Sequence, residues 1–296
     1  MSSAPGSSDA EAGVGQAVDG AGAGSSAAGS WSIRSARSAS WTAFRSLIGR
    51  DLAVLRQTIK QFLPRVLLQP LLLMFVFTYV FPKIGQGIGG GNREFSTLLM
   101  AGVLGTTMIF QGVQGVALPL VQEFGFTKEI EDRILAPAPL WVVAAAKVVS
   151  GAIQTLIAAA LVFPIGFFVP ATPIHLRVHW LVLVTLVPLV AICAASFGMF
   201  FGTRFEPRQI PVLFGIIIVP MTFLGCTYYP WKALHAIRWL QVLVCFNPLV
   251  YFAEGFRAAL TRSPHLPLWA IYGALISFTT VFGGLGFRQF KARVLT

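Results

Sequence analysis

The sequence predicts an all-α integral membrane protein, and its composition, the length of its apolar blocks and the placement of its charges lead to this prediction. The 296 residues are 55% hydrophobic and 11% charged, with a mean hydropathy of +0.74. Soluble domains carry roughly 25% charged residues, so this chain has fewer than half the usual number. The apolar residues form blocks near or above the roughly 20 residues that cross a bilayer as a helix.

The first 38 residues differ from the rest of the chain. They are mainly Ser, Ala and Gly and hold almost no large apolar side chains. Such a segment cannot bury enough apolar surface to offset the entropy lost on ordering, so we expect residues 1–38 to be a disordered tail. They also lack the apolar central run of a secretory signal peptide.

An apolar stripe of helical periodicity follows the tail. Its members recur every three or four residues and are Trp41, Phe44, Ile48, Leu52, Leu55, Ile59 and Phe62. The basic residues of this stretch fall off the stripe, as in helices that lie in the headgroup layer, so we predict an interfacial amphipathic helix over 41–62. A soluble helix packed on a partner is the alternative. Pro64 is expected to end the helix before the first crossing.

Six apolar blocks are predicted to cross the membrane as helices. They are about 64–82, 97–121, 139–169, 178–202, 209–229 and 266–287. The third is longer than one span requires, so we expect it to tilt or to begin at the interface. A further block at 239–253 is too short to span and is interrupted by Asn247-Pro248. We therefore predict an outer re-entrant hairpin over about 232–256.

The basic residues predict the orientation of these crossings, because Lys and Arg concentrate in cytoplasmic loops. With the N-terminus inside, fifteen of the 22 basic residues are cytoplasmic and seven are outside. Both termini are therefore predicted to be cytoplasmic in a multi-pass protein of the plasma membrane. The loop between the second and third crossings lies on the same side.

Several classes of function find no support in the residues. No G-x-x-x-x-G-K-[ST] phosphate loop occurs, so the chain does not bind ATP by that route. The formal charge of +11 does not indicate nucleic-acid binding, because the basic residues lie at the ends of apolar blocks. GQGIGG at 85–90 matches G-x-G-x-x-G but follows an apolar span and opens no βαβ unit, so we interpret it as a flexible loop.

The predicted crossings hold almost no ionisable groups, which argues against a proton or ion relay. Lys147 and Arg65 lie near predicted helix ends, where long basic side chains reach the interface, so we expect a structural role for them. Glu254 lies by the outer hairpin and can pair with Arg257, three positions further on.

Histidine and cysteine also point to no site. His175 and His179 are four residues apart, but no third ligand lies near them in the sequence, so no metal site is predicted. Cys193, Cys226 and Cys245 have no motif spacing and fit apolar helix packing. A bridge between Cys226 and Cys245 on the outer side remains open.

Charged residues concentrate in one loop between two long apolar blocks. They are Glu123, Lys128, Glu129, Glu131, Asp132 and Arg133. Phe126, Ile130 and Ile134 are spaced by four and share one helical face, while the charges point elsewhere. Ala136-Pro137-Ala138-Pro139 then ends the helix. We predict a short cytoplasmic amphipathic helix that a soluble partner could grip, and an ordinary solvated loop is the alternative.

Two segments resemble one family of membrane proteins. The first is EFGFTKEIEDRILAPAP at 123–139, followed by Lys147, and it is similar to the cytoplasmic coupling segment of type-2 ATP-binding-cassette (ABC) exporter permeases. The second is LGCTYYPWKALHAIRWLQVLVCFNPLVYFAEGFRAAL at 224–260. It is similar to the outer hairpin and following segment of the drug-resistance and nodulation-factor branch of that family. With the six crossings and the N-terminal helix, the resemblance covers about residues 39–296; the 1–38 tail departs from it.

The resemblance implies the permease subunit of an ATP-driven ABC exporter, which works as a homo- or heterodimer of permeases with two separate ATPase subunits. The segment 123–139 would dock into a cleft of the ATPase, so the candidate ATPase-coupling residues are Glu123, Lys128, Glu129, Glu131, Asp132 and Arg133. Of these, Glu129 and Asp132 are expected to meet basic residues of the partner.

The same resemblance assigns the chemistry to the partner. ATP and magnesium would bind to the ATPase, which leaves this chain without a cofactor, a metal or a catalytic residue. The substrate would be an amphipathic drug-like, lipid or glycan-type molecule moved out of the cytoplasm or the inner leaflet, along a path that we expect Phe, Leu, Val and Met to line.

Two other functions stay open. An ion-coupled secondary transporter predicts inverted repeats with broken helices that face each other at mid-membrane, and the two halves of the sequence show no convincing repeat. A non-transporting membrane anchor or assembly subunit would have the same hydropathy. Transport that needs an ion gradient and no ATP favours the first, and absence of any transport or stimulated hydrolysis favours the second.

Overall fold

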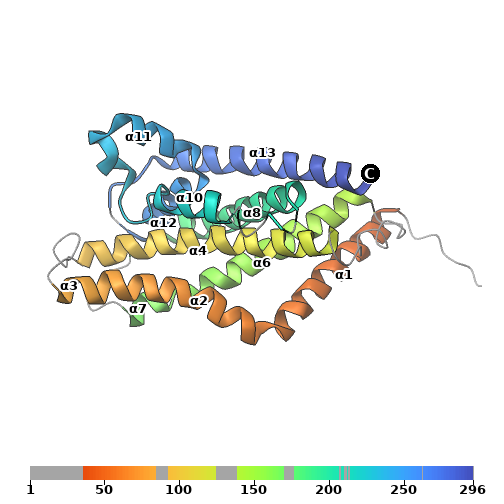
Figure 1. Ribbon diagram of the computed structural model, residues 1–296, viewed down its shortest axis with the longest axis horizontal. Helices are drawn as coiled ribbons and strands as arrows, with labels where there is room; N and C mark the ends of the chain where they lie inside the picture. Colours follow the sequence, from red (N-terminus) through yellow and green to blue (C-terminus); the bar gives the residue numbers. More distant parts are fainter. Residues whose placement is uncertain are drawn as a thin grey trace, which may run out of the picture. The chain divides into compact units, whose positions relative to one another are not determined.

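The computed structural model of the chain describes residues 36–84, 93–124, 139–169, 177–206, 208–209, 212, 214–261 and 263–295. All regular structure within these ranges is helical (Figure 1), which confirms the all-α fold class. The α-helices are α1 (Ala36–Gln57), α2 (Ile59–Phe75), α3 (Phe81–Lys83), α4 (Arg93–Gln122), α6 (Leu140–Val162), α7 (Ile165–Phe168), α8 (Trp180–Arg204), α10 (Val219–Phe223), α11 (Arg238–Leu243), α12 (Pro248–Leu260) and α13 (Leu268–Leu295). The π-helical turns are η1 (Val76–Val80) and η3 (Phe214–Ile218), and the 3₁₀ turns are η4 (Trp231–Ala236) and η5 (Val244–Phe246).

Five stretches of helix in the described residues are long and apolar enough to cross a membrane. They are Ile59–Lys83, Phe95–Gln122, Leu140–Val162, Trp180–Arg204 and Leu268–Val294. A sixth is counted if Arg238–Phe246 and Pro248–Leu260 form one span, although the two are bent by 96° at Asn247. The bend falls where the sequence predicts an outer hairpin. The chain is thus an integral membrane protein with several crossings.

The predicted crossing at 209–229 falls partly outside the described residues, so it stays a prediction. Its described part contains η3 and α10. The chain leaves α8 at Phe205 and returns to α4 by Thr227, whose hydroxyl lies 3.1 Å from the hydroxyl of Thr106. The third crossing, predicted at 139–169, is the single helix α6, which ends at Val162 and is followed by the one-turn helix α7.

The first two helices are separated at Thr58, and the sequence-based boundary at Pro64 was wrong. Thr58 has φ −95° and ψ 10°. Its backbone N–H and its hydroxyl both donate to the carbonyl of Val54, at 3.0 and 2.9 Å, so the break is a change in backbone dihedral angles at Thr58. Pro64 lies inside α2, because membrane helices tolerate proline better than soluble ones.

The apolar stripe at 41–62 is divided by this break. Leu55 and Phe62 are buried, whereas Trp41 is 60% exposed. Helix α1 packs mainly against α6, and it runs away from α2 at an angle (Figure 1). An amphipathic helix that contacts its own domain on one side leaves the rest of its apolar face for lipid, so the interfacial location stays a prediction.

Helix α4 forms the centre of the helical bundle over residues 36–295. It packs against α8, α6, α12 and α2, and α13 packs against α8. A Cβ atom on Gly112 would lie 2.4 Å from the Cβ of Ala194, and one on Gly198 would lie 2.5 Å from the carbonyl oxygen of Gly112. Small residues let the backbones of α4 and α8 approach closely, which holds membrane helices together where lipid removes the hydrophobic driving force.

The carboxyl ends of α4, α8 and α13 meet at one end of the bundle. The guanidinium of Arg293 donates to the carbonyls of Thr203 and Phe205, at 3.2 and 3.3 Å, and lies 4.9 Å from the ring centroid of Phe124. Phe124 in turn contacts Phe290 edge-on, with ring centroids 5.7 Å apart. The start of α6 lies at the same end (Figure 1). The segment 123–139, which we call the charged loop, therefore connects α4 to α6 at the end of the bundle where three helices end and one begins.

Candidate functional site

Four charged side chains from three helices form one group at this end of the bundle. We call it the charge cluster, and its members are Arg50 and Asp51 of α1, Glu123 directly after α4, and Lys147 of α6. Lys147 Nζ donates to Glu123 Oε1 at 2.6 Å and lies 3.5 Å from Asp51 Oδ2. Arg50 Nη2 lies 3.1 Å from Asp51 Oδ1 and 3.6 Å from Glu123 Oε1. The Ser150 hydroxyl donates to Asp51 Oδ2 at 3.0 Å.

The charge cluster is largely shielded from solvent. The side chains of Lys147, Glu123 and Asp51 are 7%, 11% and 14% exposed, and Arg50 forms the outer rim at 45%. Two carboxylates and two basic groups balance each other in formal charge. Removing one partner from such a group leaves another charge buried without compensation, which costs far more than the pair gains. The cluster therefore specifies how α1, α4 and α6 fit together.

Members of the charge cluster lie on both sides of the charged loop: Glu123 is its first residue, and Lys147 follows it. Glu123 precedes residues 125–138, and α6 starts directly after Pro139, which has the extended ψ of 140°. Lys147 lies seven residues beyond the start of α6, about two helical turns. The ion pair between Glu123 and Lys147 therefore joins the two helices that carry the loop, and Asp51 adds α1 to them.

Of the six candidate coupling residues, the structure describes Glu123. It brings Glu123 together with Lys147 and Asp51, neither of which the sequence assigned to the site. The other five candidates, Lys128, Glu129, Glu131, Asp132 and Arg133, lie outside the described residues. Their role as coupling residues stays a prediction.

The structural role expected for Lys147 agrees with its ion pairs, but the expectation that its side chain reaches the interface was wrong. It is buried and ion-paired, because two carboxylates from other helices neutralise it. Asp51 carried a signal that could have found it. It is the only acidic residue in the basic stretch 41–62, and a lone acid in a basic helix indicates a specific partner.

A second buried ion pair lies in α12, at the other end of the chain's fold. Arg257 Nη1 lies 2.8 Å from Glu254 Oε1, and both side chains are 0% exposed. This confirms the pairing predicted from the spacing. The same carboxylate accepts hydrogen bonds from the backbone N–H groups of Trp231 and Leu266, both at 2.9 Å. The pair thereby ties the start of η4 and the approach to α13 onto α12.

Arg257 also fixes the chain that precedes η4. Its Nη2 donates to the carbonyl of Thr227 at 3.1 Å and to the carbonyl of Cys226. Cys226 has a φ of 53°, a left-handed conformation that the two bonds hold in place. Cys226 and Cys245 are free thiols in this structure. Among the residues that the structure describes, no group of three His, Cys, Asp or Glu side chains is placed to hold a metal ion.

Comparison of the sequence with known proteins identifies the family of this chain. The family described as "ABC-2 type transporter" matches residues 42–261. The chain is also 26% identical over 250 residues to a protein of Escherichia coli K12 named "Inner membrane transport permease YadH", covering 82% of this chain and 92% of the relative. Proteins of the same name from Escherichia coli O157:H7 and Shigella flexneri match equally well. The family match extends over most of the described helices, including both sides of the charged loop. The chain belongs to the ABC-2 type transporter family.

Proposed function

We propose that this chain, a membrane permease of an ABC transporter, works as an exporter. The charged loop would contact a separate ATP-binding subunit, and movement of that subunit during ATP hydrolysis would displace the loop. Two permease copies would assemble with two ATP-binding subunits and move an amphipathic drug-like, lipid or glycan-type molecule outward. The residues that would contact the ATP-binding subunit are Glu123, Lys128, Glu129, Glu131, Asp132 and Arg133. ATP and magnesium would bind to that subunit.

The charge cluster is the observation that carries this proposal. It links α1, α4 and α6 at the point where the charged loop enters and leaves the bundle. A partner that moves the loop would displace α4, the most buried of the candidate crossings, together with α6. Because buried ion pairs resist separation, the displacement would be passed to α1 and to the helices packed on α4. A solvated loop without such an anchor could move alone.

The orientation predicted from the basic residues supports the same proposal. The predicted cytoplasmic side holds fifteen basic residues against seven outside. The relatives in Escherichia coli and Shigella flexneri carry names that contain "inner membrane transport permease". With both termini inside, the charged loop faces the compartment that holds ATP, where an ATP-binding subunit would reach it.

The proposal is tested by reversing charge in the loop. Glu129→Lys combined with Asp132→Lys is expected to abolish co-purification of the ATP-binding subunit with the full-length chain and to abolish ATP-driven transport. Membrane insertion should be unchanged, because both positions lie between the crossings. The matched control is Asp9→Lys with Asp19→Lys, the same change of charge outside the family match. Normal co-purification and transport by the loop variant would remove the coupling assignment.

A further inference from the structure

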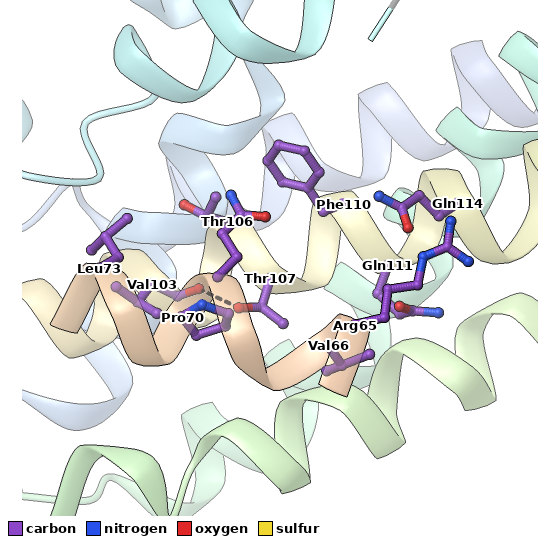
Figure 2. A pocket seen from close by; sticks show the side chains of 11 residues that line it. Arg65, Val66, Pro70, Leu73, Val103, Thr106, Thr107, Phe110, Gln111 and Gln114 are labelled. Carbon is purple, nitrogen blue, oxygen red and sulfur yellow. Dashed lines mark hydrogen bonds between the residues drawn. The ribbon is translucent and has the colours of Figure 1, made fainter. Parts of the chain in front are cut away.

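A polar groove runs along α2, α4 and α6 inside the membrane-crossing part of the chain. Thr58, Gln61, Arg65 and Gln69 recur every three or four residues and so share one face around α2. Gln111 and Gln114 of α4 border the same hollow as Arg65, and Gln154 of α6 closes it on the third side. Figure 2 shows Arg65 reaching toward the α4 side chains from α2. We call this feature the polar groove.

The polar groove extends from the charge cluster toward the middle of the bilayer. A hollow of about 330 Å³ lies between Asp51 and Gln111, and it continues into a neck of about 40 Å³ beside Thr106 and Thr107. Gln111 lies eleven residues before the end of α4, which corresponds to about 16 Å along a helix. That depth is about half of a hydrocarbon core of roughly 30 Å.

Polar side chains at such a depth need a reason, because hydrocarbon offers them no hydrogen-bonding partner. Gln111 is only 7% exposed and borders both parts of the groove. Within the described part of the chain, no side-chain hydrogen bond is formed by the amides of Gln61, Gln69, Gln111, Gln114 and Gln154. Their donors and acceptors are therefore available to a molecule in the groove.

The charge in the polar groove is positive. Arg65 is exposed and has no ion-pair partner among the residues that the structure describes. Asp51, at the wide end, is already engaged by Lys147 and Arg50. A guanidinium binds phosphate and carboxylate groups through parallel hydrogen bonds, and amides supply donors and acceptors for hydroxyl groups. The lining thus matches an anionic headgroup that also carries hydroxyl groups.

The surface next to the groove is apolar. Leu68, Leu71 and Leu72 of α2 are exposed and available to lipid. A molecule with its headgroup in the groove could keep its hydrocarbon part in the bilayer beside α2. This avoids the cost of moving either part into the wrong medium.

We propose that the polar groove binds the headgroup of the transported molecule, and that this molecule is an anionic amphiphile whose head bears hydroxyl groups. The proposal rests on the proposed function for the statement that the bound molecule is cargo. Arg65 would hold the anionic group, Gln111 and Gln114 would hold the hydroxyl groups, and the narrow neck would select for a small head.

Binding is tested with the full-length chain in phosphatidylcholine nanodiscs, without ATP and without a partner. The probe is fluorescent phosphatidylglycerol, and phosphatidylcholine with the same fluorophore and acyl chains is the comparison. We expect wild type to prefer the phosphatidylglycerol probe by about tenfold or more, the effect of one charge-assisted hydrogen bond. Arg65→Gln should lose the preference, and Arg65→Lys should keep part of it.

Two matched controls separate the groove from general effects. Arg56→Gln removes an exposed charge of α1 that does not border the groove, and it should retain the preference. Gln111→Leu with Gln114→Leu should weaken binding of phosphatidylglycerol, while Gln241→Leu in α11 should not. Equal binding of the two probes by wild type, or equal losses in Arg65→Gln and Arg56→Gln, would overturn the proposal. If Arg65→Gln lowers the melting temperature, the comparison of Gln111→Leu, Gln114→Leu with Gln241→Leu tests binding in the groove instead.

A second measurement separates cargo from a lipid that merely resides in the groove. In vesicles that hold the chain with its ATP-binding subunit, ATP should change the fraction of nitrobenzoxadiazole-labelled phosphatidylglycerol that dithionite can reach. A probe that binds in nanodiscs but is not redistributed by ATP would contradict its assignment as cargo. Failure of the proposed coupling is recognised by a different result: the Glu129→Lys, Asp132→Lys chain would co-purify normally with the ATP-binding subunit.

Discussion

At the scale of single residues, the two buried ion pairs show which contacts a sequence can predict. Glu254 and Arg257 are three positions apart on one helix, so their pairing followed from helical spacing. Lys147 meets Glu123 and Asp51 from different helices, 24 and 96 positions away. No local pattern contains such a contact, and for that reason the buried position of Lys147 was missed.

Lys147→Met is predicted to destabilise the chain by about 3 kcal/mol, because the largely buried Asp51 and Glu123 would keep only the half-exposed Arg50 as a cation. Lys147→Arg should cost less, and adding Glu123→Gln to Lys147→Met should recover part of the loss. Thermal unfolding of the purified variants in detergent measures these differences. An unchanged melting temperature for Lys147→Met would show that the charge cluster does not hold the three helices.

Arg257→Met is predicted to release the chain before η4, since the carbonyls of Cys226 and Thr227 would lose their donor. The thiol of Cys226, fully buried in the native chain, should then react faster with a maleimide. The measurement is made in a Cys193→Ala, Cys245→Ala background. Arg238→Met, which removes an exposed charge of α11, should leave the rate as it was. Equal reaction rates in the background chain, Arg257→Met and Arg238→Met would show that Arg257 does not hold the segment with Cys226 in place.

At the scale of helices, hydropathy predicted the long crossings well and their ends less well. The blocks at 97–121 and 178–202 correspond to α4 and α8, because an uninterrupted apolar run has one stable form in lipid. The boundary at Pro64 was wrong, because the backbone already departs from helical geometry at Thr58 and Pro64 lies inside α2. The ψ of 10° at Thr58 is a backbone feature that a proline rule does not contain.

The contact between α4 and α8 gives a prediction at this scale. Gly112→Ala should destabilise the chain by about 1–3 kcal/mol, because its Cβ would overlap Ala194. Gly273→Ala in α13 has no atom within 4 Å of the new Cβ and should be neutral or stabilising, as alanine favours a helix by up to about 1 kcal/mol. Thermal unfolding of the two variants checks the opposite signs. Equal effects would mean that the backbones are not packed as closely as the structure places them.

At the scale of the whole molecule, the chain is a multi-pass protein of the cytoplasmic membrane and the permease of an ABC transporter. The family was suggested by the resemblance of segments 123–139 and 224–260, and the family match over residues 42–261 confirms it. The polar groove was not predicted, and the sequence led us to expect a path of Phe, Leu, Val and Met. Its glutamines come from three helices and are scattered among apolar residues, so only their juxtaposition reveals it.

The central claim is that a separate ATP-binding subunit drives this permease through the loop between α4 and α6. The most direct measurement is maleimide labelling of Glu129→Cys in a chain with Cys193, Cys226 and Cys245 replaced by alanine. An impermeant maleimide should label this position in inside-out vesicles, should not label it in intact cells, and should be blocked when the ATP-binding subunit is bound. Labelling from the outer face of intact cells would contradict the account.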